Sequence, residues 1–486
     1  MELLNKSISR PKEYPVKVVQ FGEGNFLRAF VDYMIDVANE KELFNGSVVM
    51  LKPIEFGSLN QFHEQEYQYT LTLRGVQEGK EVVTNRIISS VKDAVSVYEE
   101  YEKFIGLARA ESLRFVVSNT TEAGISYDDG DSYDAKPPRT YPAKLTKFLY
   151  ERYAAFSGAA DKGLIILPVE LIDGNGIVLK EYVLKYAKLW GLGEGFVKWL
   201  REACVFCSTL VDRIVTGYPK EEAEGLWKQF GYQDNLLVTA EPFGLWVIES
   251  DKDISKELPL PEAGLPVIFT DNQAPYKQRK VRILNGAHTS FVLASYLAGN
   301  DYVLESMQDE TIRKFMKSVI FEEVIPTLTL PKEELIDFAD SVIERFENPF
   351  IKHELLSIAL NSVSKWRARC LPSLLKYVEL KSKLPEHLVF SIAALISFYS
   401  SSELKEDCAL GNRNGETYAI RDDREVLEFF YRANGLPLEQ LVREYLSNSS
   451  FHGWDLTEVP DLCNEVIRDL GWIRTHGMRK ALEMLG

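Results

Sequence analysis

The chain has 486 residues, and its 72 Asp and Glu outnumber its 56 Lys and Arg, which gives a formal net charge of −16 at pH 7. Hydrophobic residues make up 45% and charged residues 26%, an ordinary balance for a globular protein that excludes a disordered or fibrous chain. The length is enough for two or three domains, and the acidic balance argues against nucleic acid or an anionic membrane as a partner.

Cysteine usage and the shortness of the apolar segments indicate a cytoplasmic protein. Five cysteines are an odd and sparse set, so we expect no disulfide framework. Cys204 and Cys207 form an isolated C-x-x-C pair, for which burial on a helix face is favoured over a redox role. The N-terminal residues lack the apolar core of a signal peptide. The apolar stretch Leu388 to Tyr399 is about half the roughly 20 residues of a membrane span.

The first half of the chain alternates short apolar runs with amphipathic segments. The apolar runs predict buried strands at residues 16–21, 47–51, 114–118 and 164–172. Helical periodicity predicts helices at residues 26–37, 94–108 and 143–153. Buried strands that alternate with helices are typical of an α/β fold with a mostly parallel sheet, because parallel strands need crossover connections.

The second half of the chain has a different texture, with long amphipathic stretches and proline breakers. These stretches predict helices at residues 281–298, 309–325, 332–346, 353–363, 386–400 and 424–434. We therefore expect a mainly α-helical C-terminal domain. The segment Asp271 to Pro275 is the candidate boundary, which divides the chain into domains of residues 1–272 and 273–486.

An acidic loop at Asp128 to Asp134 resembles a calcium-binding loop only superficially. Its glycine falls too early, and the position that needs a bidentate Glu holds Arg139. A solvated surface loop is the favoured interpretation, and we predict no metal site.

Gly22 and Gly24 follow the first predicted strand and open the first predicted helix. Such a turn lets backbone N–H groups approach a pyrophosphate at a helix N-terminus, and Arg28 could add a cation. The third glycine of the usual fingerprint is replaced by Leu27, and the acidic residue expected after the second strand is replaced by Lys52. Lys52 could even tolerate a 2′-phosphate. The alternative is a turn whose glycines serve steric needs only.

A second polar loop, Ser118 to Gly124, follows the third predicted strand. Ligands of open α/β sheets bind outside the carboxyl ends of the strands, so this loop is well placed for nicotinamide contacts. The alternative interpretation is a helix N-cap with a capping box.

The segment Lys280 to Thr289 carries a set of side chains suited to proton transfer at a secondary alcohol. On an ideal helix at about 100° per residue, Lys280, Asn285 and His288 fall on one side. A lysine whose pKa is lowered by burial or by neighbouring cations can act as a general base, and amide and imidazole groups can donate to an alkoxide. The alternative is an exposed lysine, a capping asparagine and a structural histidine.

With these segments the chain resembles the mannitol dehydrogenase family, from about Tyr14 to the C-terminus. The resemblance rests on Gln20–Phe30, Ser118–Tyr127, Glu170–Gly176, Ser208–Pro219 and the lysine–asparagine–histidine segment. It implies a Rossmann-like NAD-binding N-terminal domain and a helical C-terminal domain, with metal-independent catalysis. Within the family the chain is similar to the uronate branch, which implies the interconversion of D-tagaturonate and D-altronate.

The resemblance also implies roles for individual residues. Lys280 matches the general acid/base, Asn285 and His288 match the groups that contact the alkoxide and the substrate, and Asp212 matches a residue that borders the substrate. Together with the glycine turn and the polar loop, it predicts a cofactor site formed by Phe21, Gly22, Gly24, Asn25, Phe26, Arg28, Asn119, Thr121 and Glu122.

One departure from the family pattern bears on the substrate. Polyol dehydrogenases of the family have an asparagine where this chain has Leu171, so Asn285 would have to do more of the work on the alkoxide. A uronate carboxylate needs a fixed cation. We expect Lys365, with Arg345, to bind it, whereas Arg367 and Arg369 also fit a solvated helix face.

Several alternatives stay open at this point. The substrate could be a fructuronate–mannonate pair or a neutral polyol, and a non-catalytic dinucleotide-binding sensor would keep the glycines without needing Lys280, Asn285 and His288 together. NAD over NADP rests on the resemblance alone. We expect a small-molecule substrate as partner and a monomer or small homo-oligomer.

Overall fold

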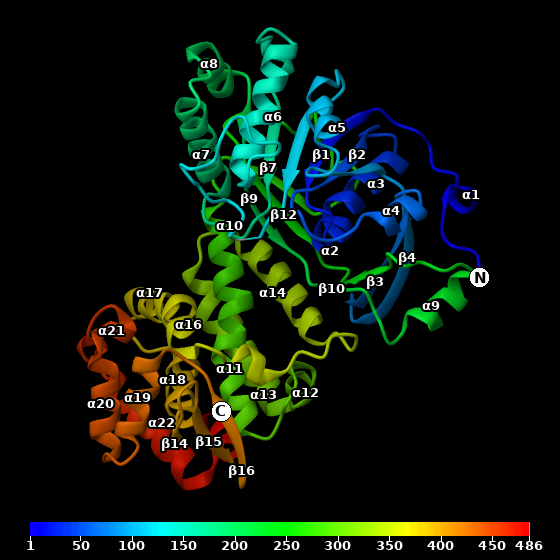
Figure 1. Cartoon of the computed structure of the whole chain (residues 1–486). Coiled ribbons are helices and arrows are strands. Elements are labelled where there is room, and N and C mark those ends of the chain that lie inside the picture. The colour runs from blue at the N-terminus through cyan, green and yellow to red at the C-terminus, as the bar shows by residue number, and fades with distance from the viewer. Residues whose placement is uncertain (122, 486) are drawn as a thin grey trace. The chain divides into compact units, whose positions relative to one another are not determined.

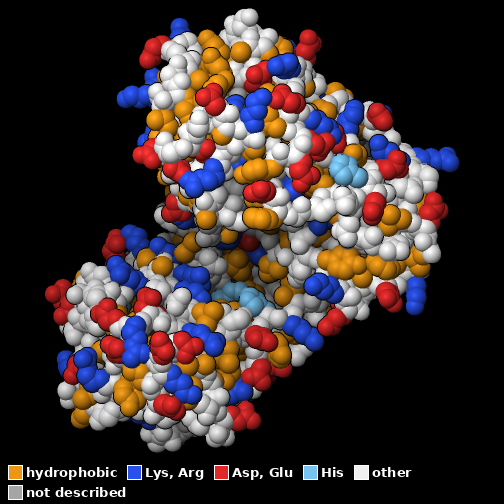
Figure 2. Space-filling view, in the orientation of Figure 1, with side chains coloured by type: hydrophobic (Ala, Val, Ile, Leu, Met, Phe, Trp, Pro, Cys, Tyr) orange, Lys and Arg blue, Asp and Glu red, His pale blue; other side chains and the backbone are white. Residues whose placement is uncertain are grey.

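The computed structural model describes residues 1–121 and 123–485, which form two compact units (Figure 1). Unit 1 comprises Met1–Gly75 and Glu81–Gln273, and unit 2 comprises Val76–Lys80 and Ala274–Gly486. Acidic and basic side chains are interspersed over the visible face of each unit (Figure 2), so the charges on that face are not gathered in one field.

Unit 1 is built on a six-stranded parallel sheet with the order β5-β2-β1-β6-β7-β8. Its strands are β1 (Val16–Phe21), β2 (Ser47–Lys52), β5 (Val91–Ser96), β6 (Phe115–Ser118), β7 (Ile165–Pro168) and β8 (Val205–Phe206). In chain order this is 3-2-1-4-5-6, the strand order of a dinucleotide-binding fold, which reverses between β1 and β6. The expectation of an α/β fold with a mostly parallel sheet is confirmed.

The central strands are mostly apolar because both faces of the sheet are covered. Alternate residues of the central strands belong to two separate cores: Val18 and Val117 to one, Val19 and Val116 to the other. The first core includes the helix after β1 and the second includes the helices after β5, β6 and β7. Helices on both faces are what right-handed crossovers between parallel strands produce.

Further elements of unit 1 surround this sheet. Its helical segments are α1 (Lys6–Ser9), α2 (Asn25–Leu27), η1 (Arg28–Asp32), α3 (Tyr33–Glu40), α4 (Asn60–Glu64), α5 (Tyr101–Gly106), η2 (Leu107–Arg109), α6 (Tyr141–Ala155), η3 (Ala160–Lys162), α7 (Asn175–Leu189), α8 (Glu194–Glu202) and α9 (Ala223–Phe230). Two smaller sheets have the orders β10-β11-β3-β4 and β13-β12-β9. Their strands are β3 (Tyr69–Gln77), β4 (Lys80–Ile88), β9 (Ser208–Asp212), β10 (Val215–Gly217), β11 (Val238–Ala240), β12 (Leu245–Glu249) and β13 (Val267–Thr270).

Unit 2 is mainly helical, as expected, with one small antiparallel sheet. Its helical segments are α10 (Ala274–Arg279), η4 (Lys280–Asn285), α11 (Gly286–Leu297), α12 (Val303–Gln308), α13 (Glu310–Ser318), η5 (Val319–Val324), η6 (Ile325–Thr327), α14 (Lys332–Phe346), α15 (Leu355–Ile358), α16 (Ser362–Arg369), α17 (Leu371–Lys381), α18 (Glu386–Phe398), α19 (Arg424–Ala433), α20 (Leu438–Ser447), α21 (Ser449–His452), η7 (Leu456–Glu458), α22 (Leu462–His476) and α23 (Met478–Leu485). The sheet consists of β14 (Ser401–Leu404), β15 (Ala409–Arg413) and β16 (Glu416–Ile420). The apolar helix α18 packs against α11 and α22 and is buried along most of its length.

Three expectations about local structure are wrong. The start of the predicted helix 94–108 is the end of strand β5, because pairing with β2 decides its conformation. The predicted helix 353–363 is interrupted by Asn361, whose φ of 53° is left-handed, and only α15 and the start of α16 are helical there. The predicted strand 164–172 ends at Pro168, so the residues after it form the turn into α7.

The cysteines are free and buried. Cys204 and Cys207 are buried, as expected, but they flank the edge strand β8. The expectation that they lie on a helix face is wrong. Burial raises the pKa of each of these two thiols to about 12, so neither is a ready thiolate. Among the described residues, no helix is long and apolar enough to cross a bilayer.

Candidate active site

The turn after β1 needs a glycine at its first position and leaves open space at its third. Gly22 has a φ of 124°, and a Cβ there would lie 3.1 Å from Leu27 Cδ1 and 3.2 Å from the Asn119 carbonyl oxygen. Gly24 has an ordinary φ of −69°, and a Cβ there would meet no protein atom within 4 Å. The protein itself therefore does not require a glycine at position 24, whereas a group that approaches the backbone would.

Gly24 is the N-cap of a continuous helical run from Asn25 to Glu40, made of α2, η1 and α3. No side chain caps this N-terminus at Gly24, and both Gly24 and Asn25 are exposed. The first N–H groups of a helix are orphan donors at the positive end of its dipole. This end of the run can therefore receive an anion such as a pyrophosphate.

Arg28 is buried beneath the turn. Its guanidinium donates to the Leu236 carbonyl (2.6 Å) and to Asn25 Oδ1 (2.5 Å), and it lies over the Tyr69 ring at 5.1 Å. Burial lowers the pKa of Arg28, while Tyr69 and nearby carboxylates oppose that shift. Arg28 thus holds the side chain of Asn25 at the helix start. Its predicted contact with phosphate stays a prediction.

Lys52, at the end of β2, points into its own loop. The ammonium donates to the carbonyl oxygens of Gly57 (2.9 Å) and Glu55 (3.3 Å) and lies 3.6 Å from Glu99 Oε1. The side chain is almost fully buried, so it organises the loop after β2 rather than presenting a cation to a ligand's 2′-phosphate.

The polar loop after β6 is held by Glu170, which the sequence did not single out as a functional residue. The Glu170 carboxylate accepts hydrogen bonds from Ser118 Oγ (3.1 Å) and from both the N–H and the hydroxyl of Thr120 (2.9 Å each). Burial raises the pKa of Glu170, and these donors oppose the shift. The clamp fixes the loop beside Gly22, where the Asn119 N–H donates to the Phe21 carbonyl at 3.0 Å.

The predicted cofactor residues of unit 1 therefore gather where the strand order reverses. Phe21 ends β1, Phe26 is partly buried in the helix start, and Asn119 follows β6. Thr121 has a left-handed φ of 73° in the same loop, and Glu122 lies outside the described residues. A cavity of about 450 Å³ opens at this edge, lined from both the loop after β2 and the loop after β6.

The turn after β7 is fixed by a buried asparagine. Asn175 Nδ2 donates to the carbonyl oxygens of Pro168 and Glu170 at 3.0 Å each, and its Oδ1 accepts the Thr209 N–H at 2.9 Å. Leu171 lies in this turn and is 64% exposed. It is the residue at the position where the family resemblance leads us to expect an asparagine. Asp212 is buried at the end of β9.

In unit 2, Lys280 and Asn285 lie at the two ends of a π-helical segment. The segments α10, η4 and α11 are contiguous, so one helical run from Ala274 to Leu297 carries a π-helical insertion at Lys280–Asn285. The ideal α-helical angles assumed for this segment are therefore wrong. π-bulges inside α-helices are frequent at functional sites, since they change which side chains share a face. Lys280 and Asn285 are both partly exposed.

His288 follows one turn later and is enclosed by rings. It stacks on Phe346 at 4.2 Å between ring centroids and meets the His353 ring edge-on at 5.3 Å. His288 Nε2 is buried without a hydrogen-bond partner in the described part of the chain. Burial holds the pKa of His288 well below its ordinary value, and His353, Arg345, Arg369 and Lys365 push it in the same direction. The imidazole is therefore neutral at neutral pH and keeps one N–H to donate.

The cations that lower the pKa of His288 come from two other helices. Arg345 is the buried last-turn cation of α14, while Lys365 and Arg369 lie on α16. Lys365 Nζ donates to the Ile358 carbonyl at 2.9 Å, and Arg369 donates to Thr289 Oγ1 at 3.2 Å. Arg369, which the sequence left open as a solvated residue, belongs to this cluster. Arg367 does not, since it donates to the Ser450 carbonyl at 3.4 Å.

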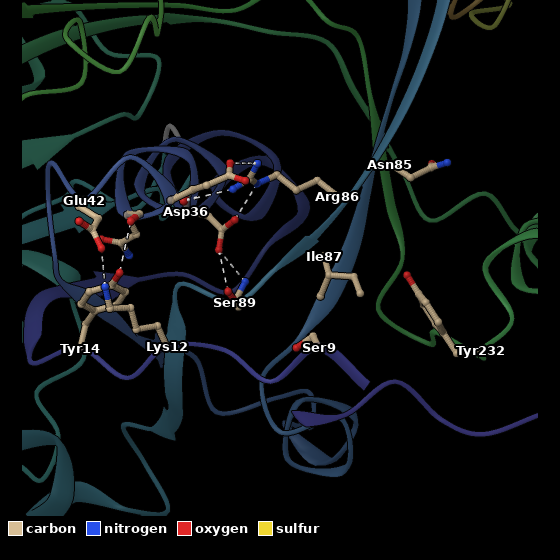
Figure 3. Close-up of a pocket in the computed structure, with 12 residues that line it drawn as sticks. Ser9, Lys12, Tyr14, Asp36, Glu42, Asn85, Arg86, Ile87, Ser89 and Tyr232 are labelled. Atoms are coloured by element: carbon tan, nitrogen blue, oxygen red, sulfur yellow. Dashed lines mark hydrogen bonds and ion pairs between the residues drawn. The ribbon is translucent and has the colours of Figure 1, made fainter. Parts of the chain in front are cut away.

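One other cavity does not contribute to this site. The cavity in Figure 3, of about 690 Å³, lies at the amino-terminal edge of the large sheet, between Tyr14 before β1 and the end of α3. Both of its cations are paired: Arg86 is bound to Asp36 (2.6 Å) and Glu40 (2.7 Å), and Lys12 is bound to Glu42 (2.8 Å). The acidic loop borders the cavity of about 450 Å³, which Asp128 lines, and its Asp131 accepts the N–H groups of Arg139 and Thr140 in the following segment. In the described ranges, no cluster of three His, Cys, Asp or Glu side chains could hold a metal ion.

Comparisons with known proteins agree with this architecture. The Mannitol dehydrogenase Rossmann domain matches residues 16–262, and the Mannitol dehydrogenase C-terminal domain matches residues 272–473. Altronate oxidoreductases of Escherichia coli O1:K1 and of strain SE11 are each 48% identical over 492 residues, covering 100% of both chains.

Two solved structures share the fold at 22% identity. A substrate-free D-sorbitol dehydrogenase has a TM-score of 0.80 and covers 99% of this chain and 100% of its own. Pseudomonas fluorescens mannitol 2-dehydrogenase, in a ternary complex with NAD and D-mannitol, has a TM-score of 0.67 and covers 100% of this chain and 99% of its own. The chain belongs to the mannitol dehydrogenase family.

Proposed function

We propose that this protein is an NAD-dependent oxidoreductase that interconverts D-altronate and D-tagaturonate, with NAD⁺ oxidising the aldonate and NADH reducing the ketouronate. The observation that carries the proposal is the cluster of Arg345, Lys365 and Arg369 around His288, on the helical run of Lys280. A neutral polyol has no charge that would need three cations. The full-length similarity to altronate oxidoreductases supports the same substrate.

The cofactor half of the proposal assigns NAD to residues 1–272 and substrate chemistry to residues 273–486. The space beside Gly24 fits a pyrophosphate, because a Cβ there would meet no protein atom and the helix N-terminus behind it has free N–H donors. The cavity of about 450 Å³ suits the adenosine half. Asn119 and Thr121 then face the nicotinamide half, beyond the end of β6.

When bound, NADH supplies a hydride to the carbonyl carbon of the ketouronate. Lys280, in its ammonium form, gives a proton to the carbonyl oxygen, so that the carbonyl becomes a secondary alcohol and the lysine becomes a neutral amine. In the oxidation Lys280 takes that proton back. Asn285 donates an amide N–H to the same oxygen, where negative charge develops in the transition state.

The neutral imidazole of His288 contributes a hydrogen bond to the substrate without adding a charge. Its low pKa keeps it from competing with Lys280 for the proton, since an imidazole with a lowered pKa is a weak base. Arg345 and Lys365 bind the substrate carboxylate, and Asp212 accepts from a substrate hydroxyl. These assignments follow from residue chemistry and the family pattern.

The substrate is tested by measuring NADH oxidation with D-tagaturonate, D-fructuronate and D-tagatose. We expect the highest kcat/KM with D-tagaturonate. A preference for D-fructuronate would reassign the enzyme to the mannonate pair, and a preference for D-tagatose would overturn the uronate proposal. NADH binding without turnover of any of the three would favour a dinucleotide-binding sensor.

Removing either carboxylate-binding cation is expected to weaken substrate binding rather than chemistry. Lys365→Ala and Arg345→Ala each raise the KM for D-tagaturonate by about tenfold to a hundredfold, as expected for losing a hydrogen bond to a charged group. Steady-state kinetics measures this, with Arg367→Ala as the matched control on the same helix. An unchanged KM in both variants would contradict the assignment.

Two glycine variants in the turn after β1 test the cofactor site and serve as controls for each other. Gly24→Val is expected to fold normally but to raise the Kd of NADH about tenfold or more, because its methyl groups fill the space beside the helix N-terminus. Gly22→Val is expected to lose about 1–3 kcal/mol of unfolding free energy, because it forces a side chain into a strained φ. NADH fluorescence titration and urea unfolding separate the two effects. Normal NADH affinity in Gly24→Val would contradict the pyrophosphate assignment.

The cellular setting follows from the same chemistry. Buried free cysteines are the usage of a protein from a reducing compartment, and we place the enzyme in the cytoplasm. A monomer or a small homo-oligomer stays a prediction.

A further inference from the structure

Helix α16, which carries Lys365 and Arg369, is not capped by the residue that precedes it. Asn361 has a left-handed backbone, and its side chain makes no capping hydrogen bond. The first N–H groups of a helix have no partner within the helix. In α16 they are bound by residues from distant parts of the chain: the Ser362 N–H donates to the Tyr399 hydroxyl (3.1 Å) and the Val363 N–H to Asp422 Oδ2 (3.3 Å).

Tyr399 and Asp422 form one unit. Tyr399 is buried just after the end of α18, and its hydroxyl donates to Asp422 Oδ2 while it accepts the Ser362 N–H. The other carboxylate oxygen of Asp422 accepts the Asp423 N–H at 2.8 Å. Burial raises the pKa of Tyr399 well above its ordinary value, so its hydroxyl stays a donor. The negative charge of Asp422 also lies at the positive end of the α16 dipole.

The rest of α16 is fixed by a second buried contact. Trp366 is fully buried, and its indole N–H donates to Ser391 Oγ on α18 at 2.9 Å. One face of the helix is thus anchored to α18, while Lys365 and Arg369 act on His288. The angular position of those two cations depends on how the helix is held at its N-terminus, since Lys365 lies within the first turn.

We propose that Tyr399 and Asp422 are positioning residues that fix the N-terminus of α16, so that Lys365, with Arg369 on the same helix, is held where it can bind the substrate carboxylate together with Arg345. The inference rests on the proposed function, because it gives α16 its role in uronate recognition. It adds that the preference for a uronate over a neutral ketose depends on two residues that do not touch the substrate. Neither residue is assigned a part in proton or hydride transfer.

The test is Tyr399→Phe, which removes only the hydroxyl. We expect its KM for D-tagaturonate to rise about three- to tenfold, the worth of a hydrogen bond, with kcat nearly unchanged. The kcat/KM for D-tagatose, which has no carboxylate, should stay at the wild-type value. A structural role alone would change both substrates together, so the ratio of the two kcat/KM values is the decisive readout.

Tyr418→Phe is the matched control. Tyr418 is also buried in unit 2, and its hydroxyl donates to the Phe398 carbonyl at 2.7 Å rather than to α16. The control likewise removes a buried tyrosine hydroxyl, here one that donates to a backbone carbonyl, and should leave the substrate ratio unchanged. Equal changes of the ratio in Tyr399→Phe and Tyr418→Phe would overturn the inference.

Two variants of Asp422 complete the experiment. Asp422→Asn keeps an acceptor for Tyr399 and Val363 but loses the charge and the acceptor for the Asp423 N–H, so its KM should rise less than that of Asp422→Ala, which should reproduce the KM effect of Tyr399→Phe. Circular dichroism establishes that each variant is folded. A wild-type KM for D-tagaturonate in both Tyr399→Phe and Asp422→Ala would overturn the inference and leave the proposed function standing. A wild-type enzyme that does not turn over D-tagaturonate would overturn the proposed function, and the inference with it.

Discussion

Lys280→Met is expected to lower kcat by about a hundredfold to ten-thousandfold in both directions, which is the usual contribution of a general acid/base. Without the amine, the ketouronate oxygen must take its proton from water in the reduction, and the alcohol must release it to water in the oxidation. Methionine keeps the length and apolar stem of the side chain, so the π-helical segment should keep its shape. Stopped-flow measurement of NADH oxidation with D-tagaturonate isolates the chemical step.

The control for this variant is Lys317→Met, an exposed lysine in the last turn of α13, which should keep wild-type activity. NADH affinity should be unchanged in both variants, because neither residue belongs to the cofactor site. In Lys280→Ala, partial recovery of the rate by added methylamine would show that an amine is what the site lacks. If Lys280→Met retained more than about a tenth of the wild-type kcat, the proton would have to come from another group.

The sheet of unit 1 could be predicted because its strands are buried on both faces. Val16 to Phe21 has apolar side chains on both faces except Lys17 and Gln20, and the predicted strand agrees with β1. A continuous apolar run predicts a strand buried on both faces without any knowledge of its neighbours in the sheet. The strand β5 has no comparable run, since Lys92 and Asp93 interrupt it, and it forms because β2 offers a pairing edge.

The C-terminal half was harder to predict for a similar reason. Long amphipathic helices can be predicted from the helical period of their apolar residues, and α14 has the bounds that were predicted for it. The strands β14, β15 and β16 pair with one another and are only four or five residues long. Their alternation of apolar and polar residues is therefore too short to predict a strand. The broken segment around Asn361 is invisible to periodicity, because a single left-handed residue ends one helical turn and starts another.

For the candidate site, residue identity could be predicted from the sequence but spatial grouping could not. Lys280, Asn285 and His288 are close in the chain, so one helical pattern suggested them together, although the pattern did not reveal the π-helical segment. Glu170 became a candidate, and Arg369 could be separated from Arg367, only once the fold was known. Residues that are far apart in the chain and come together only in the fold do not form a periodic pattern in the sequence.

Asn285→Ala is expected to lower kcat by about a hundredfold to a thousandfold, which is the effect of removing one donor from an oxyanion site. The loss of kcat should fall towards the upper end of that range. The family resemblance leads us to expect a second amide at the position of Leu171, and a leucine side chain cannot donate a hydrogen bond. The remaining donors near the oxygen would be Lys280 and His288. Single-turnover reduction of D-tagaturonate, compared with NADH binding, measures the change in the chemical step alone.

Asn285→Asp separates this electrostatic role from a structural one. Aspartate keeps the volume of asparagine at the end of the π-helical segment, but it replaces a donor with a negative charge beside the developing alkoxide. If Asn285 serves to stabilise that charge, Asn285→Asp must be at least as slow as Asn285→Ala, because like charges repel in a partly buried site. If Asn285 serves only to shape the helix, Asn285→Asp would be the faster of the two. That order of rates would refute the oxyanion role even if both variants were impaired.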